Sequence, residues 1–230
     1  MKTAIDYHSA FMSSPWFASM PEPLQHTLLA NAHIKHLAEG QMLHAKGDEG
    51  TGFYGVCEGR MRVVNHCTDG RTLLLALLDA GTWFGEISMF DDQPRTHDSY
   101  GENNTVIAFI PKAKFRALLE SHPDFYPFFT KLLCTRVRSA FQFINAHTGL
   151  SIEEQLKKRL LMLVTSYGQH MCKSESITLS LSQESLAQMI NSSRQTVNQL
   201  LKAMEKTGEV KLTYGKITII EPNAFFGQVQ

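Results

Sequence analysis

The sequence predicts an α+β fold: an N-terminal β-roll of the jelly-roll kind, then a long helix, then a small C-terminal domain of helices and a β-hairpin. Ten of the fifteen glycines lie between residues 40 and 101, where they separate short segments of partly alternating apolar and polar residues. A helical segment follows, with apolar residues spaced by four and three. After residue 181, two short helical patterns are joined by a tight turn and followed by a hairpin pattern.

Length and composition predict a globular protein with more than one domain. The chain has 230 residues, of which 43% are hydrophobic and 19% are charged. We divide it into a β-roll domain over residues 1–124, a helix and hinge over 125–150, and a C-terminal domain over 151–230. Basic and acidic residues are equal in number over the whole chain, and the C-terminal domain has only a small positive excess. Charge alone therefore does not decide whether the chain binds nucleic acid.

Cellular location is predicted from the first residues and the cysteines. The N-terminus, MKTAIDYHSAF, has no apolar stretch of the kind found in signal peptides, and no apolar run is long enough to cross a bilayer. We therefore expect a cytoplasmic protein without membrane contact. The four cysteines are scattered and are expected to be reduced.

Helices are predicted on both sides of the β-roll. One covers roughly residues 22–32, and the strands include residues 60–63 and 105–110. After the last strand, Pro111 opens a short helix that ends at Ser121, because His122-Pro123 interrupts the helical pattern. A longer helix begins after this break.

One stripe of the longer helix is predicted to form a dimer interface. Its residues follow alternating steps of four and three, the spacing that places one face of a helix against a partner helix. They are Leu133, Val137, Ala140, Ile144 and His147. We expect two parallel helices in a homodimer. The alternative is that the stripe packs on the chain's own β-roll.

A hinge is predicted at residues 148–150, where Thr-Gly-Leu interrupts the helix. Ser151 and Glu154 match the S-x-x-E capping box that starts a new helix. Gly168 is expected to end that helix, and a short strand over residues 177–181 follows it.

The remaining residues show the pattern of a winged helix-turn-helix. Ser182 can cap a helix over residues 183–190, and Ser193 can cap a second helix that stops at Gly208. Asn191 suits the turn between them, because asparagine tolerates a positive φ. The buried stripe of the second helix is Val197, Leu200, Leu201 and Met204. A hairpin over residues 210–220, turning at Tyr214-Gly215, completes the wing.

The exposed face of the second helix carries side chains suited to DNA. Asparagine and glutamine can bind adenine through two hydrogen bonds, arginine can bind guanine in the same way, and serine and lysine suit phosphate oxygens. The candidate DNA-binding residues are Ser182, Ser193, Arg194, Gln195, Asn198, Gln199 and Lys202. A polar helix face is often only a solvated surface, but the order of helix, turn, helix and hairpin favours DNA binding.

A second candidate site lies in the glycine-rich part of the chain. Gly85 begins a turn, Glu86 follows it, and Arg95 and Thr96 come nine and ten residues after the acid. Backbone N–H groups and the Arg95 guanidinium can hold an anion such as phosphate, Thr96 adds a hydroxyl, and Glu86 can accept a hydrogen bond from a sugar hydroxyl. The alternative is a structural ion pair between Glu86 and Arg95.

Two motifs resemble the CRP/FNR family of bacterial transcription regulators, and the resemblance covers nearly the whole chain. The segment FGEISMFDDQPRT, residues 84–96, is similar to the phosphate-binding cassette of cyclic-nucleotide-binding domains. The segment SSRQTVNQLLK, residues 192–202, is similar to the family's recognition helix and is the more specific match.

The resemblance implies roles and partners for this chain. It makes Glu86 the ribose-binding acid and Arg95 and Thr96 the phosphate ligands. It gives base reading to Arg194, Gln195 and Gln199. The implied partners are a near-palindromic DNA operator, a second copy of the chain and RNA polymerase. The candidate effector is cyclic AMP or another cyclic nucleotide.

Two positions depart from the family's pattern for cyclic AMP. Members that respond to cyclic AMP place a Thr-Ser pair on the dimer helix to recognise adenine, whereas the matching positions here are Ala140 and Phe141, which cannot form those hydrogen bonds. Two possibilities for regulation therefore stay open. Either a small anion binds in the β-roll, or the regulator needs no ligand or responds to a different trigger.

Other function classes receive less support. An iron–sulfur cluster of the family's kind needs clustered N-terminal cysteines, and the first cysteine here is Cys57. A cupin-type metalloenzyme needs two histidines on one strand face, whereas His33 and His36 point to opposite faces of a regular strand. A cyclic-nucleotide sensor that acts on a protein instead of DNA is a third class. We expect no catalytic residue and no metal, and therefore no enzyme.

Overall fold

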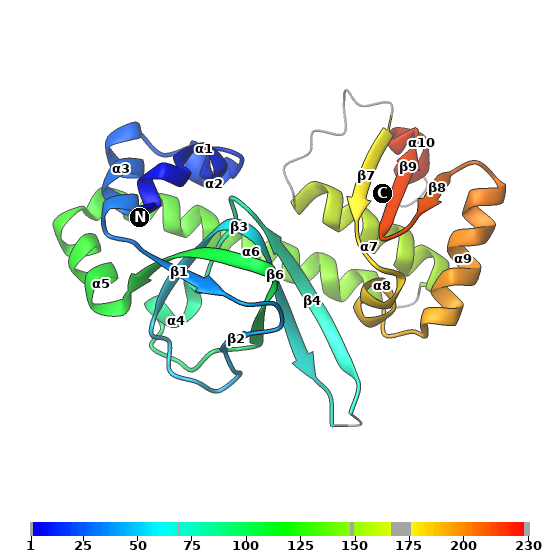
Figure 1. Cartoon of the computed structure of the whole chain (residues 1–230), viewed down its shortest axis with the longest axis horizontal. Helices are drawn as coiled ribbons and strands as arrows, with labels where there is room; N and C mark the ends of the chain where they lie inside the picture. The colour runs from blue at the N-terminus through cyan, green and yellow to red at the C-terminus, as the bar shows by residue number, and fades with distance from the viewer. Residues whose placement is uncertain (1, 69, 148–149, 167–175, 228–230) are drawn as a thin grey trace. The chain divides into compact units, whose positions relative to one another are not determined.

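The computed structural model describes residues 2–68, 70–147, 150–166 and 176–227 (Figure 1). The chain forms two compact units, residues 1–65 with 75–139 and residues 66–74 with 140–230, which are described separately below. Most of the expected hinge and the helix end expected at Gly168 lie outside the described residues.

The first unit begins with four short helical segments. They are η1 (Ala4–Tyr7), α1 (His8–Phe11), α2 (Pro15–Ala18) and α3 (Glu22–Ala30). The sequence predicted only the last of these, whose pattern ends two residues earlier than expected. The first three are too short to show a helical period, and they are held in place by the complete burial of Phe11 and Phe17. Tertiary packing, more than helix propensity, therefore stabilises this segment.

A curled sheet follows, in the strand order β1-β6-β3-β4, with β2 paired to β6 and β5 paired to β3 (Figure 1). Its strands are β1 (His33–Leu37), β2 (Met42–His44), β3 (Gly52–His66), β4 (Thr72–Asp79), β5 (Trp83–Phe84) and β6 (Asp98–Pro111). In the antiparallel β3–β6 pair, Phe53 lies opposite Ile110 and Val56 opposite Ile107. The predicted β-roll is confirmed, and the two predicted strand segments are parts of β3 and β6, which are much longer than expected.

An aromatic core joins the sheet to the helices around it. The rings of Phe53 and Trp83 are 5.2 Å apart, and Phe53 also packs on Phe115 and Phe129 at 5.5 and 5.4 Å. All four side chains are almost completely buried. Aromatic rings bury large apolar areas, so this cluster fixes the position of the helices against the sheet.

Two predicted helices follow the sheet, and the second extends beyond the first unit, which ends at Ser139. Helix α5 (Lys112–Ser121) has the expected bounds, and the short helix η2 (Pro123–Phe125) fills the expected break before α6 (Tyr126–His147). Phe129 and Leu132 of α6 are buried in the core. On another face of α6, the apolar side chains of Val137 and Phe141 are exposed.

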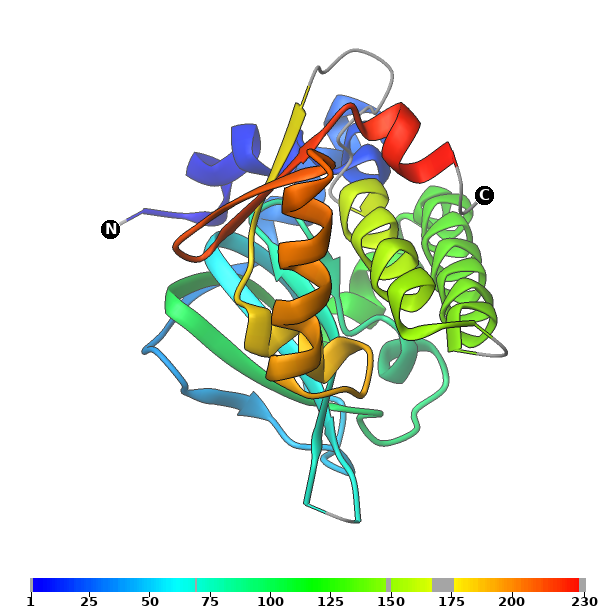
Figure 2. The same cartoon turned by 90° about the vertical axis from the view of Figure 1, so that its right-hand side faces the viewer.

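The second unit contains a winged helix-turn-helix. Its elements are α7 (Ile152–Ser166), β7 (Ser176–Ser180), α8 (Gln183–Met189), α9 (Arg194–Lys206), β8 (Val210–Thr213), β9 (Lys216–Ile220) and α10 (Pro222–Gly227). The three strands pair in the order β7-β9-β8. Helix α9 lies beside the β8–β9 hairpin, as Figure 2 shows. The two helices, the turn and the wing all lie where the sequence predicted them.

The capping box at the start of α7 is confirmed. The backbone N–H and the hydroxyl of Ser151 donate to the Glu154 carboxylate at 2.8 and 2.7 Å, and the Glu154 N–H donates to the Ser151 hydroxyl at 3.2 Å. These bonds satisfy backbone donors that a helix start otherwise leaves to water. Helix α7 therefore begins directly after the Ser151 cap, as the sequence predicted.

Candidate functional site

Local signals in the sequence hold the helix-turn-helix in shape. The Ser182 hydroxyl accepts from the Ser185 N–H at 3.0 Å, and the Ser193 hydroxyl accepts from the Thr196 N–H at 3.0 Å. Asn191, in the turn between the helices, has φ +53°. Both predicted caps and the predicted left-handed turn are therefore present.

Helix α9 has one buried and one exposed face. Val197, Leu201 and Met204 are buried, whereas the predicted fourth member of the stripe, Leu200, is only half-buried. The exposed side chains include Arg194, Gln195, Gln199, Lys202 and Lys206, and Ala203 and Glu205 are exposed as well. Polar groups suited to base edges and phosphates thus share one accessible surface, as the sequence predicted.

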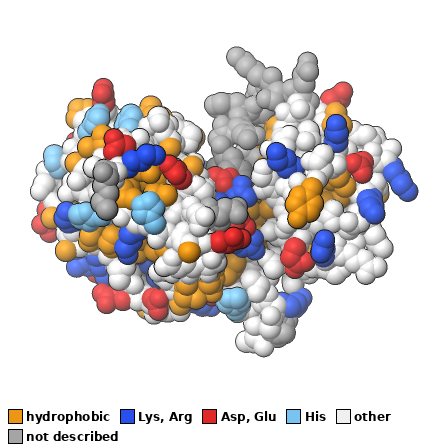
Figure 3. Space-filling model, in the orientation of Figure 1, with side chains coloured by type: hydrophobic (Ala, Val, Ile, Leu, Met, Phe, Trp, Pro, Cys, Tyr) orange, Lys and Arg blue, Asp and Glu red, His pale blue; other side chains and the backbone are white. Residues whose placement is uncertain are grey.

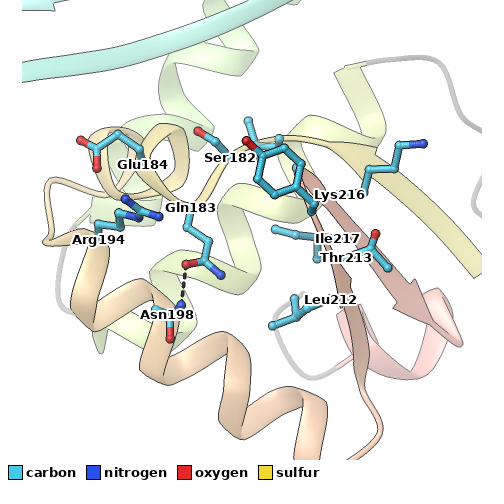
Figure 4. A pocket seen from close by; sticks show the side chains of 12 residues that line it. Ser182, Gln183, Glu184, Arg194, Asn198, Leu212, Thr213, Lys216 and Ile217 are labelled. Carbon is cyan, nitrogen blue, oxygen red and sulfur yellow. Dashed lines mark hydrogen bonds between the residues drawn. The ribbon is translucent and has the colours of Figure 1, made fainter.

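Asn198 differs from the other candidates on this helix. It is half-buried, and its Nδ2 group donates to the Gln183 Oε1 atom of α8 at 2.6 Å (Figure 4). The sequence placed it among freely exposed side chains, but one of its donors is already bonded within the domain. Ser182 and Ser193 likewise use their hydroxyl oxygens as helix caps.

A pocket of about 530 Å³ lies between the two helices and the wing (Figure 4). It is lined by residues 181–184 at the start of α8, by Arg194 and Asn198 of α9, and by residues 212–217 of the wing. Tyr214 at the turn of the wing is fully exposed. Helix α9 and the wing therefore border one concave surface that carries cationic, acidic, amide and aromatic side chains.

On the face of the winged domain drawn in Figure 3, positive charge forms no single dominant patch. On the face shown in Figure 3, Lys and Arg side chains are scattered over the surface of the winged domain. A face with scattered cations would attract phosphates only modestly, so affinity for DNA would depend more on contacts with base edges.

The predicted anion cassette folds around Gly85 and Arg95. Gly85 has φ +91°, and a Cβ atom there would lie 2.8 Å from Arg95 Nη1, so only glycine fits. Arg95 is 5% exposed and donates to the backbone oxygens of Gly85 at 2.9 Å and Gly52 at 2.5 Å. Its guanidinium also lies 5.2 Å from the centre of the Tyr54 ring.

Arg95 is a buried cation that forms no direct ion pair, although the buried Glu86 carboxylate is near enough to influence its pKa. Among the described residues, no carboxylate forms an ion pair with it, and its Nε atom has no hydrogen-bond partner. Burial lowers the pKa of this guanidinium. The structural ion pair with Glu86 that the sequence left open is therefore not formed, and the positive charge is available to an anion.

Glu86 pairs with a residue that the sequence analysis did not single out. Its carboxylate is 2% exposed, and Oε1 accepts from Arg136 Nε of α6 at 2.9 Å. Arg136 Nη2 also donates to the Trp83 backbone oxygen at 2.6 Å. The second carboxylate oxygen of Glu86 has no partner among the described residues. One carboxylate oxygen of Glu86 is thus hydrogen-bonded and the other is not. The Glu86–Arg136 bond connects the cassette to α6.

The loop between Glu86 and Arg95 carries compensated charges. Asp92 has a positive φ of 58° and forms ion pairs with Lys112, at 2.9 Å, and with Arg116, both from α5. The hydrogen bond from Lys112 lowers the pKa of the Asp92 carboxyl. Thr96 is exposed and its hydroxyl bonds to the His97 ring at 2.8 Å, so it does not share the buried position of Arg95.

His44 gives a pH-dependent prediction. Its ring stacks on Tyr54, and burial, followed by the nearby charge of Arg95, lowers its pKa to about 4. Because an unfolded histidine has a pKa of about 6.5, the unfolded chain binds the extra proton first. The free energy of unfolding should therefore fall as the pH falls from 7 toward 4, by about 1–2 kcal/mol between pH 7 and pH 5. Urea unfolding of wild type and His44→Leu at both pH values measures this, and an equal loss in both proteins would contradict it.

The predicted dimer stripe is largely exposed on α6. Val137, Phe141 and Ile144 are 54%, 62% and 55% exposed, and Ala140 is exposed as well. Leu133, at the start of the predicted stripe, is half-buried. The side chain of His147 lies outside the described part of the chain. The exposed apolar face of α6 is therefore slightly offset around the helix from the predicted stripe and includes Phe141.

Two residues that bond to candidate site residues, Arg136 and Gln183, were not among the candidates from the sequence. Arg136 continues the inward spacing of Phe129 and Leu132, so a charged residue on a buried face was the signal for its role. Gln183 carried no signal, since a polar first residue of a helix is ordinary. Each forms a hydrogen bond with a candidate site residue on another helix or loop: Arg136 with Glu86, and Gln183 with Asn198.

Neither a cluster of metal-ligating side chains nor a membrane-spanning helix is found among the described residues. No group of three or more His, Cys, Asp and Glu side chains in that part of the chain could hold a metal ion. In the same residues, no helix combines the length and the apolar composition of a bilayer span.

Comparisons with known proteins match both units. The model of the family described as "Cyclic nucleotide-binding domain" matches residues 34–122, and the model described as "Crp-like helix-turn-helix domain" matches residues 154–225. The cAMP-activated global transcriptional regulator CRP of Haemophilus influenzae is 25% identical over 210 residues, which cover 90% of this chain and 92% of that protein.

Solved structures share the fold over most of the chain. FixK2 from Bradyrhizobium japonicum superposes with a TM-score of 0.73 at 13% identity and covers 85% of this chain and 96% of its own. The c-di-GMP responsive global regulator CLP of Xanthomonas campestris superposes with a TM-score of 0.69 at 18% identity, covering 87% of this chain and 99% of its own. Each of the two covers more than four fifths of this chain.

Proposed function

Because the chain belongs to the CRP/FNR family of bacterial transcription regulators, we propose that it binds a near-palindromic operator as a homodimer and that a small anion in the β-roll controls this binding. The observation that carries the proposal is the capped helix-turn-helix, which exposes Arg194, Gln195 and Gln199 on one face of α9. The recognition helices of a dimer enter successive major grooves about one DNA turn apart. Such a regulator works on DNA in the cytoplasm.

The exposed stripe of α6 supports the homodimer. Apolar side chains as exposed as Val137, Phe141 and Ile144 are unfavourable in water, and a second copy of the same helix would cover them. A symmetric pair also places two copies of α9 on one operator, which explains the need for a palindrome.

The β-roll supports an anionic effector. Arg95 offers a buried, unpaired guanidinium, and the free oxygen of Glu86 can accept one hydrogen bond. Relatives that are named for cyclic AMP or cyclic di-GMP respond to cyclic phosphodiesters. An anion of that class would neutralise Arg95 and use the free oxygen of Glu86 through a hydroxyl group. Ala140 and Phe141 fit adenine poorly, so the base is not necessarily adenine.

The bond between Glu86 and Arg136 suggests how the signal leaves the pocket. Arg136 lies on α6 next to Val137 of the dimer stripe, and it already holds one oxygen of Glu86. A change in the hydrogen bonds of Glu86 would shift Arg136 and with it the packing of α6 in the dimer. If the segment 148–150 acts as the hinge that the sequence predicts, it would pass this change to the winged domain.

Selection from a pool of randomised DNA duplexes tests the proposed function. The full chain should enrich a site with two inverted half-sites whose centres are about one helical turn apart. Enrichment of no sequence, with and without cyclic nucleotides, would contradict DNA reading. RNA polymerase recruitment is a separate expectation, which transcription in vitro from a promoter with the selected site would measure.

The dimer makes a prediction for one side chain of the stripe. Val137→Ala removes apolar area twice from the interface, once in each protomer, so the dimer should dissociate about tenfold more readily. Analytical ultracentrifugation over a range of concentrations measures the constant. Thr135→Ala is the control, because Thr135 is exposed on the same helix but outside the stripe. Equal dissociation constants for Val137→Ala and wild type would contradict the assigned interface.

A further inference from the structure

The pocket beside the recognition helix contains a pair of amides in a fixed arrangement. Asn198 lies one turn after Arg194 on the side of α9 that faces the pocket, and Gln183 faces it from the first turn of α8 (Figure 4). Asn198 Nδ2 donates to Gln183 Oε1 at 2.6 Å. A hydrogen bond thus joins the side chains of two consecutive helices, α8 and α9, at the surface predicted to bind DNA.

The bond determines which edge of Asn198 is available to a base. An asparagine amide has one acceptor oxygen and two N–H donors, and a half-turn of the amide exchanges the donor and acceptor positions. With one N–H bonded to Gln183 Oε1 at 2.6 Å, that exchange would bring two amide oxygens together unless the Gln183 amide turned as well. The bond therefore favours one orientation of the Asn198 amide, which leaves Oδ1 and the second N–H for a base, the two kinds of group that pair with the N6 and N7 atoms of adenine.

Gln183 is itself held in place. It is the first residue of α8, directly after Ser182, whose hydroxyl accepts from the Ser185 N–H at 3.0 Å. The helix cap fixes the backbone from which Gln183 extends. A side chain that is ordered before binding loses less conformational freedom when DNA arrives.

We propose that Gln183 is a positioning residue that fixes the Asn198 amide for reading one adenine in the operator. The proposal rests on the proposed DNA-binding function and assigns specificity to a residue outside the recognition helix. Asn198 touches the base, and Gln183 acts through Asn198.

The test measures discrimination at each base pair of the selected operator. Competition binding with the full chain compares the selected site with single-base-pair changes, for wild type, Asn198→Ala, Gln183→Met and the double variant. Asn198→Ala should lower discrimination at one A·T pair about tenfold. Gln183→Met, which has similar length but no acceptor oxygen, should lower it severalfold at the same pair, and the double variant should resemble Asn198→Ala.

Two further variants separate positioning from a general structural role. Gln183→Glu keeps an acceptor for Asn198 and should retain the discrimination, although its charge weakens binding to all sequences. Asn223→Ala alters an exposed amide of the same domain outside the pocket and should leave the base profile unchanged. Thermal unfolding of Gln183→Met should match wild type.

The possible failures are distinguishable. If Gln183→Met weakens binding equally for every sequence, Gln183 is only a backbone or packing residue and the proposal is wrong. If Asn198→Ala changes discrimination at no base pair, the proposal is also wrong, while DNA binding itself stands. If wild type selects no sequence, the proposed function fails together with this inference.

Discussion

Arg194→Ala combined with Gln199→Ala is expected to lower affinity for the selected operator by about 100-fold to 1,000-fold. Each residue can form a two-bonded contact with a base, and each such contact contributes about 1–3 kcal/mol of discrimination. Both side chains are exposed on α9, so their removal leaves the buried stripe of Val197, Leu201 and Met204 intact. Fluorescence anisotropy with the selected operator and with unrelated DNA measures both affinities.

The double variant has a matched control on the same helix. Lys206→Ala also removes one positive charge, but Lys206 lies in the last turn of α9, far from the turn that carries Arg194. It should weaken binding to all sequences slightly and equally, as the loss of a phosphate contact does. If the double variant bound operator as tightly as wild type, the assignment of α9 as the reading helix would be wrong.

The winged domain could be predicted well because its signals are local. Serines that cap helices act on backbone groups three residues away, and Asn191 sets the turn by its own conformation. The periodic burial of α9 also follows from spacing alone, with only Leu200 less buried than expected. Sequence patterns of a few residues were therefore enough to place α8, α9 and the wing.

The β-roll was predicted in kind but not in detail. The long strands β3 and β6 are held together by pairs such as Phe53 with Ile110, which are far apart in sequence. The three helical turns before α3 exist because Phe11 and Phe17 are buried against the rest of the unit. Neither feature has a local signal, since both depend on tertiary contacts.

In the candidate effector site too, the residues that have a local sequence signal were predicted and the contacts between distant residues were not. Gly85, Glu86 and Arg95 were found from their spacing, and the structure brings them close to one another. The Arg136 partner of Glu86 lies fifty residues away, so spacing could not reveal it. Thr96 matched the motif in sequence, yet its side chain is exposed and bonds to His97. A motif thus predicts which residues meet, but not how each side chain is engaged.

Arg95→Ala is expected to weaken binding of the effector by about 100-fold. A charge-assisted pair of hydrogen bonds from a buried guanidinium to an anionic phosphodiester is worth roughly twice a neutral pair, and a hydrogen bond to a charged group contributes about 1.5–3 kcal/mol. Calorimetric titration with cyclic AMP, cyclic GMP and cyclic di-GMP measures this. Wild type should release or absorb heat with at least one of the three, and the variant should lose that signal at the same concentrations.

Arg116→Ala is the matched control, because Arg116 carries the same charge and pairs with Asp92 in the same loop, but its side chain is half exposed and outside the core. It should bind the nucleotide as wild type does, which would assign the loss to the position of Arg95 and not to net charge. Equal affinity in wild type and Arg95→Ala would mean that the nucleotide binds elsewhere. No heat from wild type with any of the three probes would remove cyclic nucleotides as effectors. The exposed stripe and the Glu86–Arg136 bond would then belong to a regulator that is switched by another trigger or is always active.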